Sequence, residues 1–411
     1  MIRALAPVTA LLFGVAILLA GQGLQGVLIP VRAALEEFST VSIGLMGGAY
    51  FLGFTFGCLR GGDLIRRVGH VRVFAAMTAV ASAAPLLHGL WAVAWMWALL
   101  RVISGYCFAV LYVVIESWLN EHATNETRGT VFSAYVLITL TVLAVGQQML
   151  LLYDPQRMAL FAIASALVSL AAVPVVLSNS PKPQQPDTIK LDIGHLHRLS
   201  PAGVIGCFAA GLVAGTFWSL APLFTAAHSS DVGLAASFMT ASVLGGAIGQ
   251  WPLGLWSDRV DRRLVLAVIA LVASATGATM WLMAPQLSIA GIIGLAALWG
   301  AVSFPMYSIS TAHANDYAAP DEYVLVSSGL LLMYGIGAII GPFIASGMMT
   351  WLAPGGLYLF TALVNVVFGV YLMYRTVRRT PPSERAQFSD ALASAQTASS
   401  VYEEELYEEE Q

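Results

Sequence analysis

Arg101 is a positive charge placed deep inside a long apolar segment, and this makes it the strongest single candidate for chemistry in the chain. It lies about ten residues, or roughly 15 Å of helix, into the segment 92–116. An arginine at the centre of a bilayer costs about 2.5–3.5 kcal/mol on insertion scales, so it should face a cavity or a polar partner. We expect a functional role in a cavity; a structural polar bridge is the alternative.

Polar side chains in two other apolar segments stand at a similar depth. Gln22 and Gln25 lie one helical turn apart among glycines, and Trp218 and Ser219 lie in a later segment. We expect these residues to line the same cavity as Arg101. For the glutamines, hydrogen bonding between packed helices is an equally reasonable role.

Glu116 is the one carboxylate within a predicted membrane segment. It lies about four helical turns from Arg101, too far for a direct salt bridge unless another residue intervenes. A carboxylate at this depth is suited to binding and releasing protons. The alternatives are a hydrogen bond to Ser133 or Tyr135, or simply the surface end of its helix.

Two tyrosines, Tyr112 and Tyr307, occupy related places in the two halves of the chain. We expect them near the inner end of the cavity, as cavity or gate residues. Tyrosines are also common at membrane interfaces, which is the alternative.

Composition determines the elements that must position these residues. With 58% hydrophobic and 10% charged residues, the chain lacks the polar surface of a soluble globule. Twelve apolar segments are long enough to cross about 30 Å of hydrocarbon as helices. They are 8–30, 43–61, 71–90, 92–116, 129–152, 157–178, 200–226, 233–255, 264–284, 287–311, 324–350 and 355–375. The sequence therefore predicts an all-α membrane protein with twelve transmembrane helices.

Basic residues predict the orientation, because short cytoplasmic loops collect Lys and Arg. With the amino terminus inside, only Arg32 and Arg157 fall on the outer side, and every other Lys or Arg except Arg101 falls on the inner side. Residues 179–199 read as a cytoplasmic linker between six-helix bundles at 1–178 and 200–375. Residues 376–411 read as a disordered acidic cytoplasmic tail.

The two halves resemble each other. Glycine and basic residues after the second helix recur about 190 residues later, around Gly254 and Asp258. Gly105, Tyr112 and Asn120 likewise recur at the same mutual spacing as Gly300, Tyr307 and Asn315. Such internal repeats are typical of secondary transporters.

These loops, the segment Arg101–Gly105 and the segment Gly337–Pro342 together resemble the major facilitator superfamily over residues 1–375. The segment Glu116–Asn120 looks like that of a bacterial branch of this superfamily. The resemblance implies two pseudo-symmetric six-helix bundles and alternating access to a central cavity lined by helices 1, 4, 7 and 10. It also implies that Arg101 serves proton coupling or anionic substrate groups.

The resemblance further predicts cytoplasmic gates at the two repeated loops. Arg66 and Arg67 should approach the acidic connection before helix 11, and Asp258, with Arg259 beside it, should face Arg128 at the positive start of helix 5. The acidic connection contains Asp316, Asp321 and Glu322. We expect these contacts to close the cytoplasmic side; the alternative is that the arginines only follow the charge rule for inner loops.

Gly337, Gly341 and Pro342 resemble a facilitator motif that is associated with antiport, although here it lies in helix 11 rather than helix 5. Proline bends a helix and glycines allow close packing, so we expect a conformational hinge. The motif favours export by antiport over uptake by symport.

No catalytic or metal-binding pattern competes with a transporter, and three unpaired cysteines indicate no disulfide framework. We expect no enzyme activity, no cofactor and no nucleic-acid partner. The expected function is proton-coupled transport of a small organic solute by a monomer among the lipids of a bacterial cytoplasmic membrane. The alternative is a non-transporting scaffold or receptor that uses the acidic tail.

Overall fold

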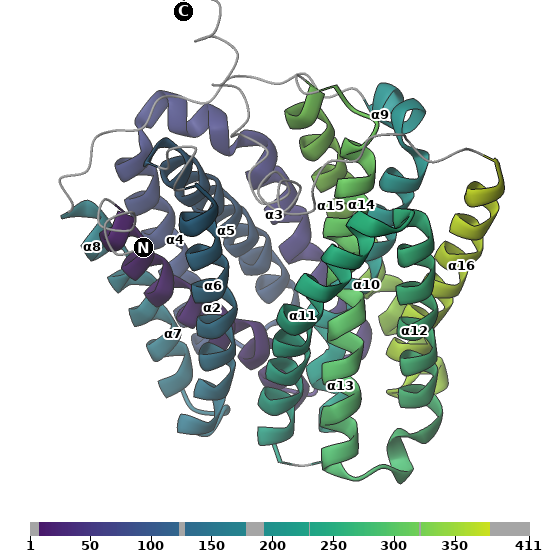
Figure 1. The fold of residues 1–411 in the computed structure, drawn as a ribbon. Helices are drawn as coiled ribbons and strands as arrows, with labels where there is room; N and C mark the ends of the chain where they lie inside the picture. Colours follow the sequence, from purple (N-terminus) through teal and green to yellow (C-terminus); the bar gives the residue numbers. More distant parts are fainter. Residues whose placement is uncertain (1–7, 123–127, 178–192, 230, 320–321, 379–411) are drawn as a thin grey trace, which may run out of the picture.

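The computed structural model describes residues 8–122, 128–177, 193–229, 231–319 and 322–378, and this part of the chain is helical without strands. Figure 1 shows two groups of helices, one formed by the first half of the chain and one by the second. The first group comprises α2 (Thr9–Leu35), α3 (Thr40–Val68), α4 (His70–Leu90), α5 (Ala94–His122), α6 (Arg128–Gln148), α7 (Ala159–Leu170) and α8 (Ala172–Val176). The second comprises α10 (Pro201–Ala226), α11 (Gly233–Arg259), α12 (Arg262–Met283), α13 (Ile289–Ser303), α14 (Pro305–Asn315), α15 (Tyr323–Leu352) and α16 (Gly356–Arg378).

Eleven helical spans of the described chain are long and apolar enough to cross a membrane. The twelfth, α11, has 27 residues, but its many glycine, serine and threonine residues make it less apolar. Two spans consist of consecutive α-helices: α7 continues into α8, and α13 continues into α14 at Pro305. The fold is thus the predicted all-α membrane architecture.

Several helices are longer than the apolar segments that predicted them. The segment 43–61 continues as helix to Val68, with Arg66 and Arg67 in the last turn. Basic side chains are favourable at the negative end of a helix, so the polar residues extend the helix instead of ending it. The predicted linker also contains a helix, α9 (Ile193–Leu199), which packs on α10 and α15; residues 179–192 lie outside the described chain.

Glycines bring equivalent helices of the two halves into the same close contacts. Gly53 of α3 lies against the Val102 carbonyl of α5, and Gly245 of α11 lies against the Ala297 carbonyl of α13. At Gly105 and at its counterpart in α13, a side-chain carbon would likewise collide with a carbonyl of the facing helix. The internal repeat seen in the sequence is therefore a repeat of helix packing.

The hydrophobic core is shared by the two halves at one end only. Near the α2–α3 and α10–α11 connections, one buried cluster includes residues of both halves, such as Leu24, Leu28, Phe217 and Phe238. Toward the α3–α4 and α11–α12 connections, the buried clusters of the described chain each belong to one half. We call the first end the closed end and the second, with its many arginines, the basic end.

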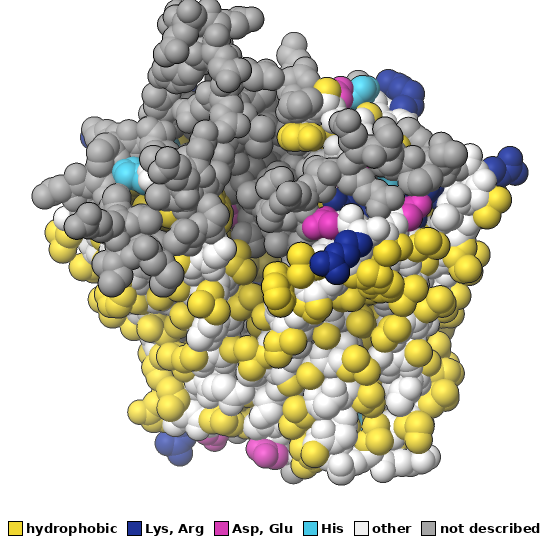
Figure 2. Space-filling model, viewed as in Figure 1, with side chains coloured by type: hydrophobic (Ala, Val, Ile, Leu, Met, Phe, Trp, Pro, Cys, Tyr) yellow, Lys and Arg dark blue, Asp and Glu magenta, His cyan; other side chains and the backbone are white. Residues whose placement is uncertain are grey.

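The molecular surface fits a membrane-embedded protein. Figure 2 shows a broad hydrophobic belt across the visible face, with charged side chains near its two rims. Large apolar side chains such as Trp251, Val367 and Ile248 are more than two-thirds exposed. Exposed apolar surface of this extent is suited to contact with lipid.

Candidate functional site

Arg101 lies in α5 with its guanidinium over the ring of Tyr50 in α3. The guanidinium carbon is 4.1 Å from the ring centroid, a cation–π contact. Arg101 is half-buried and forms no ion pair or hydrogen bond within the described chain, so its charge is balanced by no carboxylate there. Tyr50 was not identified from the sequence, because a tyrosine in an apolar helix looks like a core residue.

A hydrogen-bonded chain links Tyr50 to two predicted cavity residues. The Gln22 Nε2 donates to the Tyr50 hydroxyl at 3.0 Å, and the Tyr112 hydroxyl donates to Gln22 Oε1 at 2.7 Å. Both tyrosine rings also contact the Phe54 ring, with centroids 6.1 Å away in each case. Residues of α2, α3 and α5 therefore form one polar cluster around Arg101.

The direction of these bonds determines what the cluster offers a ligand. Because the Tyr50 hydroxyl accepts from Gln22, its own hydrogen stays available, and the Gln22 amide retains a second N–H. Together with the Arg101 guanidinium, these unused hydrogens give the cluster three kinds of donor. This combination is suited to an acceptor group, such as a carboxylate or a phosphate.

Glu116 lies one helical turn beyond Tyr112 on α5 and is half-buried. It is close enough to the Tyr112 and Tyr135 hydroxyls for electrostatic coupling, but it forms no hydrogen bond or ion pair in the described chain. Contacts among Tyr50, Gln22 and Tyr112 thus extend from Arg101 to one helical turn before Glu116.

The other predicted cavity residues do not join this cluster. Gln25 is only 2% exposed, Ser219 donates to the Gly215 carbonyl of its own helix at 2.7 Å, and Trp218 stacks on Phe304 with centroids 6.0 Å apart. Tyr307 packs against the Tyr334 ring at 5.0 Å in the second half. Depth along a helix matched these residues to Arg101, but depth does not determine which face of the helix they occupy.

The residues of the predicted hinge lie within the uninterrupted helix α15. Gly337 and Gly341 press against the carbonyls of Phe208 and Leu212 in α10. Close packing of α10 on α15 accounts for both glycines in this structure, and a hinge role stays a prediction.

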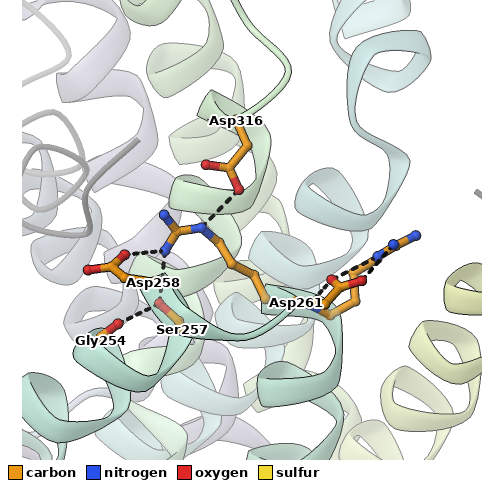
Figure 3. A network of polar contacts seen from close by, with 7 residues as sticks. Gly254, Ser257, Asp258, Asp261 and Asp316 are labelled. Atoms are coloured by element: carbon orange, nitrogen blue, oxygen red, sulfur yellow. Dashed lines mark hydrogen bonds and ion pairs between the residues drawn. The ribbon is translucent and has the colours of Figure 1, made fainter. Parts of the chain in front are cut away.

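At the basic end, Arg262 is held between two carboxylates of the second half (Figure 3). Its Nε donates to Asp316 at 2.9 Å, and its Nη1 lies 3.1 Å from Asp258 and 2.8 Å from the Ser257 hydroxyl. The side chains of Arg262 and Asp316 are 0% and 1% exposed, so this is a buried ion pair. Sequence reasoning missed it, although the repeat places the acidic residue Glu121 in the first half where Asp316 stands in the second.

A neighbouring pair fixes the start of α12. Asp261 caps this helix by accepting from the Arg263 backbone N–H and binds the Arg263 side chain at 2.7 Å, and Arg263 also donates to the Arg375 carbonyl. Burial acts to raise the pKa of the Asp261 carboxyl, but the hydrogen bonds and charge of Arg263 outweigh it and hold that pKa below its usual value. The pair ties α12 to the end of α16.

Several of the predicted gate residues have partners other than the expected ones within the described chain. Asp316 binds Arg262 of its own half because α14 ends beside the α11–α12 connection, and Arg66 binds Asp63 of its own helix. Glu322 binds His195 of α9 at 2.8 Å. The Ala319 backbone N–H, followed by His195, holds the pKa of Glu322 below its usual value. Arg67 and Arg259 are exposed. Asp321 and the side chain of Arg128 lie outside the described part of the chain, so the gate contacts that involve them stay predictions.

Comparison with known proteins agrees with this architecture. The chain matches the family model of the Major Facilitator Superfamily over residues 11–228 and 203–403. It is 28% identical over 382 residues to the Uncharacterized MFS-type transporter YcaD of Escherichia fergusonii, covering 91% of this chain and 97% of that protein. A YcaD protein of Escherichia coli is 27% identical over 380 residues, again 91% of this chain and 97% of that protein.

Solved structures share the fold at low sequence identity. The nucleoside transporter NupG superposes with a TM-score of 0.75 at 14% identity, covering 89% of this chain and 97% of that one. An inward-facing bacterial homologue of the human lysosomal transporter Spinster gives 0.69 at 15% identity, with 96% and 98% covered. The chain is a multi-pass membrane transporter of the secondary type rather than an enzyme, and it belongs to the Major Facilitator Superfamily.

Proposed function

We propose that this transporter moves a small organic solute by proton-coupled alternating access, with the solute bound at the Arg101 cluster. The observation that carries the proposal is the chain of contacts from Arg101 through Tyr50 and Gln22 to Tyr112, which lies one helical turn from Glu116. Within the described chain these contacts start at a positive charge without a carboxylate partner and end near a carboxylate without an ion pair. A proton on Glu116 and a ligand at Arg101 can then influence each other through these side chains.

The donor groups of the cluster favour a solute with an anionic or strongly accepting group. Only acceptors satisfy a guanidinium, a phenol hydrogen and an amide N–H together. The transport energy comes from a proton gradient, which contributes about 2.3 kcal/mol per charge for each 100 mV. No cofactor is needed.

The shared core at the closed end and the separate cores at the basic end support a state that opens toward the basic end. We place the basic end in the cytoplasm, with both termini inside, in the bacterial inner membrane, and the transporter acts as a monomer in the lipid. Export by antiport is favoured over uptake by symport on the Gly337–Pro342 motif.

Glu116→Gln tests the proton site. The variant keeps the size of the side chain and resembles its protonated form, but it cannot release a proton. Transport driven by a pH gradient should therefore fall at least about tenfold while exchange of solute without a gradient persists. The measurement is solute flux in proteoliposomes with and without an imposed gradient. The matched control is Glu37→Gln, which makes the same change at an exposed carboxylate in the α2–α3 connection. Gln22→Glu is unsuitable as a control because it alters the ligand cluster. Full gradient-driven flux in Glu116→Gln would remove this residue from coupling.

A charge exchange between Arg66 and Asp321 tests the cytoplasmic gate. We expect each single reversal, Arg66→Asp or Asp321→Arg, to lower transport several-fold, because like charges then meet when this end closes. The double reversal should recover part of the flux. A double variant as inactive as the single variants would contradict the gate.

A further inference from the structure

The side-chain hydrogen bonds that join the two halves within the described chain all meet at one hydroxyl, that of Thr240 in α11. Thr240 Oγ1 accepts from Gln148 Nε2 at 2.9 Å. It donates to Gln147 Oε1 at 3.1 Å, with the Ala144 carbonyl at 3.4 Å as the alternative acceptor. Gln147 and Gln148 end α6, so this contact lies at the closed end, where α6 and α11 stand side by side (Figure 1).

The contact is well placed to hold the halves together. Gln147 is 1% exposed and Thr240 is half-buried, so water competes weakly for these groups in the closed arrangement. A hydroxyl can donate one hydrogen bond and accept two, and the Thr240 hydroxyl both donates and accepts in this contact. Loss of the hydroxyl leaves the Gln147 oxygen without its donor.

The opposite flank of the molecule carries a different contact at the related positions. By the repeat, Thr240 of α11 corresponds to Gly48 of α3, and Ala144 of α6, whose carbonyl is the alternative acceptor for Thr240, corresponds to Ile339 of α15. A side-chain carbon at Gly48 would lie 2.8 Å from the Ile339 carbonyl oxygen, so the two helices touch through their backbones. One turn earlier, a side-chain carbon at Gly44 would lie 2.6 Å from the Pro342 carbonyl oxygen.

The two flanks respond differently to water. When the closed end opens, water can replace each hydrogen bond of the Thr240 contact, so separation of α6 from α11 leaves no polar group unsatisfied. Separation of α3 from α15 would remove close van der Waals contact at Gly44 and Gly48, and water does not replace that contact.

We propose that Thr240 is the releasable latch of the closed end, and that this end opens by separation of α6 from α11 while α3 and α15 remain packed as the pivot. The latch assigns a gating role to Thr240, Gln147 and Gln148 beyond solute binding and proton coupling. The inference rests on opening of the closed end during the proposed transport cycle. Its test reads conformation without any solute, so it can fail while the proposed function holds.

The test measures two distances across the closed end in purified full-length protein in nanodiscs, by double electron–electron resonance. One pair of spin labels, at Gln156→Cys and Asp231→Cys, spans the α6–α11 flank from exposed connections. The other, at Leu45→Cys and Trp351→Cys, spans the α3–α15 flank from side chains that are 49% and 88% exposed. Cys58, Cys107 and Cys207 are replaced by alanine in every sample.

Thr240→Val keeps the shape of the side chain and removes the hydroxyl. For the first pair of labels, we expect the ratio of molecules with a long label-to-label distance to molecules with a short one to rise about tenfold. For the second pair, this ratio should stay unchanged. Thr240→Ser, which retains the hydroxyl, should behave as the parent. Ser242→Ala is the matched control, because the Ser242 hydroxyl donates to the Phe238 carbonyl of its own helix at 3.0 Å and bonds no residue of the first half that the structure describes.

Distances in Thr240→Val that match the parent on the α6–α11 flank would overturn the latch. Equal lengthening on both flanks would overturn the pivot, and with it the proposal. A folded, monodisperse sample is confirmed by size-exclusion chromatography before each measurement, so misfolding is not counted as opening.

Discussion

Arg101→Ala is expected to lower ligand affinity by about tenfold to more than a hundredfold and to abolish transport at ligand concentrations that saturate the parent. Hydrogen bonds to a charged group contribute about 1.5–3 kcal/mol each, and the variant removes the one charge of the cluster. Because Arg101 has no carboxylate partner in the described chain, its removal leaves no buried carboxylate unpaired. The loss should therefore appear in binding more than in stability.

The measurement is a thermal-shift screen of purified protein with small organic anions at two pH values. Arg101→Lys keeps the charge but loses the planar group that lies over Tyr50, so it should bind with intermediate affinity. Arg157→Ala, at an exposed arginine of the closed end, is the matched control and should bind as the parent does. Unchanged ligand shifts in Arg101→Ala would move the binding site away from this cluster.

The second large effect concerns stability at the basic end. Asp316→Leu or Arg262→Met should each destabilise the protein by about 3–5 kcal/mol, because each leaves a buried charge without its main partner. The effect of Asp316→Leu should be the smaller of the two, because Asp258 still contacts Arg262 at 3.1 Å. The double variant should recover part of the loss, since an apolar pair of similar volume replaces the buried ion pair.

Thermal unfolding in detergent, followed by intrinsic fluorescence, measures these differences. Arg259→Met lies in the same connection but is exposed, so it should change stability by less than about 1 kcal/mol and serves as the control. Equal stability of Arg259→Met and Arg262→Met would show that the buried pair has no special role.

The architecture could be predicted from the sequence because a bilayer restricts the choices. Long apolar segments must be helices, and basic residues near Gly254 and Gly62 identify repeated loops. Even α11, which is less apolar than the other spans, was recognised as the apolar segment 233–255. The repeat then related its packing to that of α3.

The site was only partly predictable. Arg101 was identified by the cost of burying its charge, and Gln22 and Tyr112 were found to lie in the same cluster. Tyr50 was missed because its role depends on the close approach of α3 to α5 at Gly105, a contact between distant residues. Trp218 is predicted to line the cavity from its depth on a helix that lines it in this superfamily, and in the structure its ring stacks on Phe304.

The gate shows the same limit for charged residues. Their positions at the basic end followed from the sequence, but their partners did not, since Arg262 alone has two carboxylates within reach, Asp258 and Asp316. The structure resolves Arg262 as the partner of Asp316 because both side chains are buried together at the junction of α12 and α14.

Solute flux into proteoliposomes tests the central claim, that this chain is a proton-coupled transporter, most directly. The solute is the anion that gives the largest Arg101-dependent thermal shift, and the samples are the full chain and a form lacking residues 381–411. We predict saturable flux that responds to an imposed pH gradient, is lost in Arg101→Ala and persists without the tail. Binding without flux in the full chain would contradict the claim and favour a receptor or scaffold.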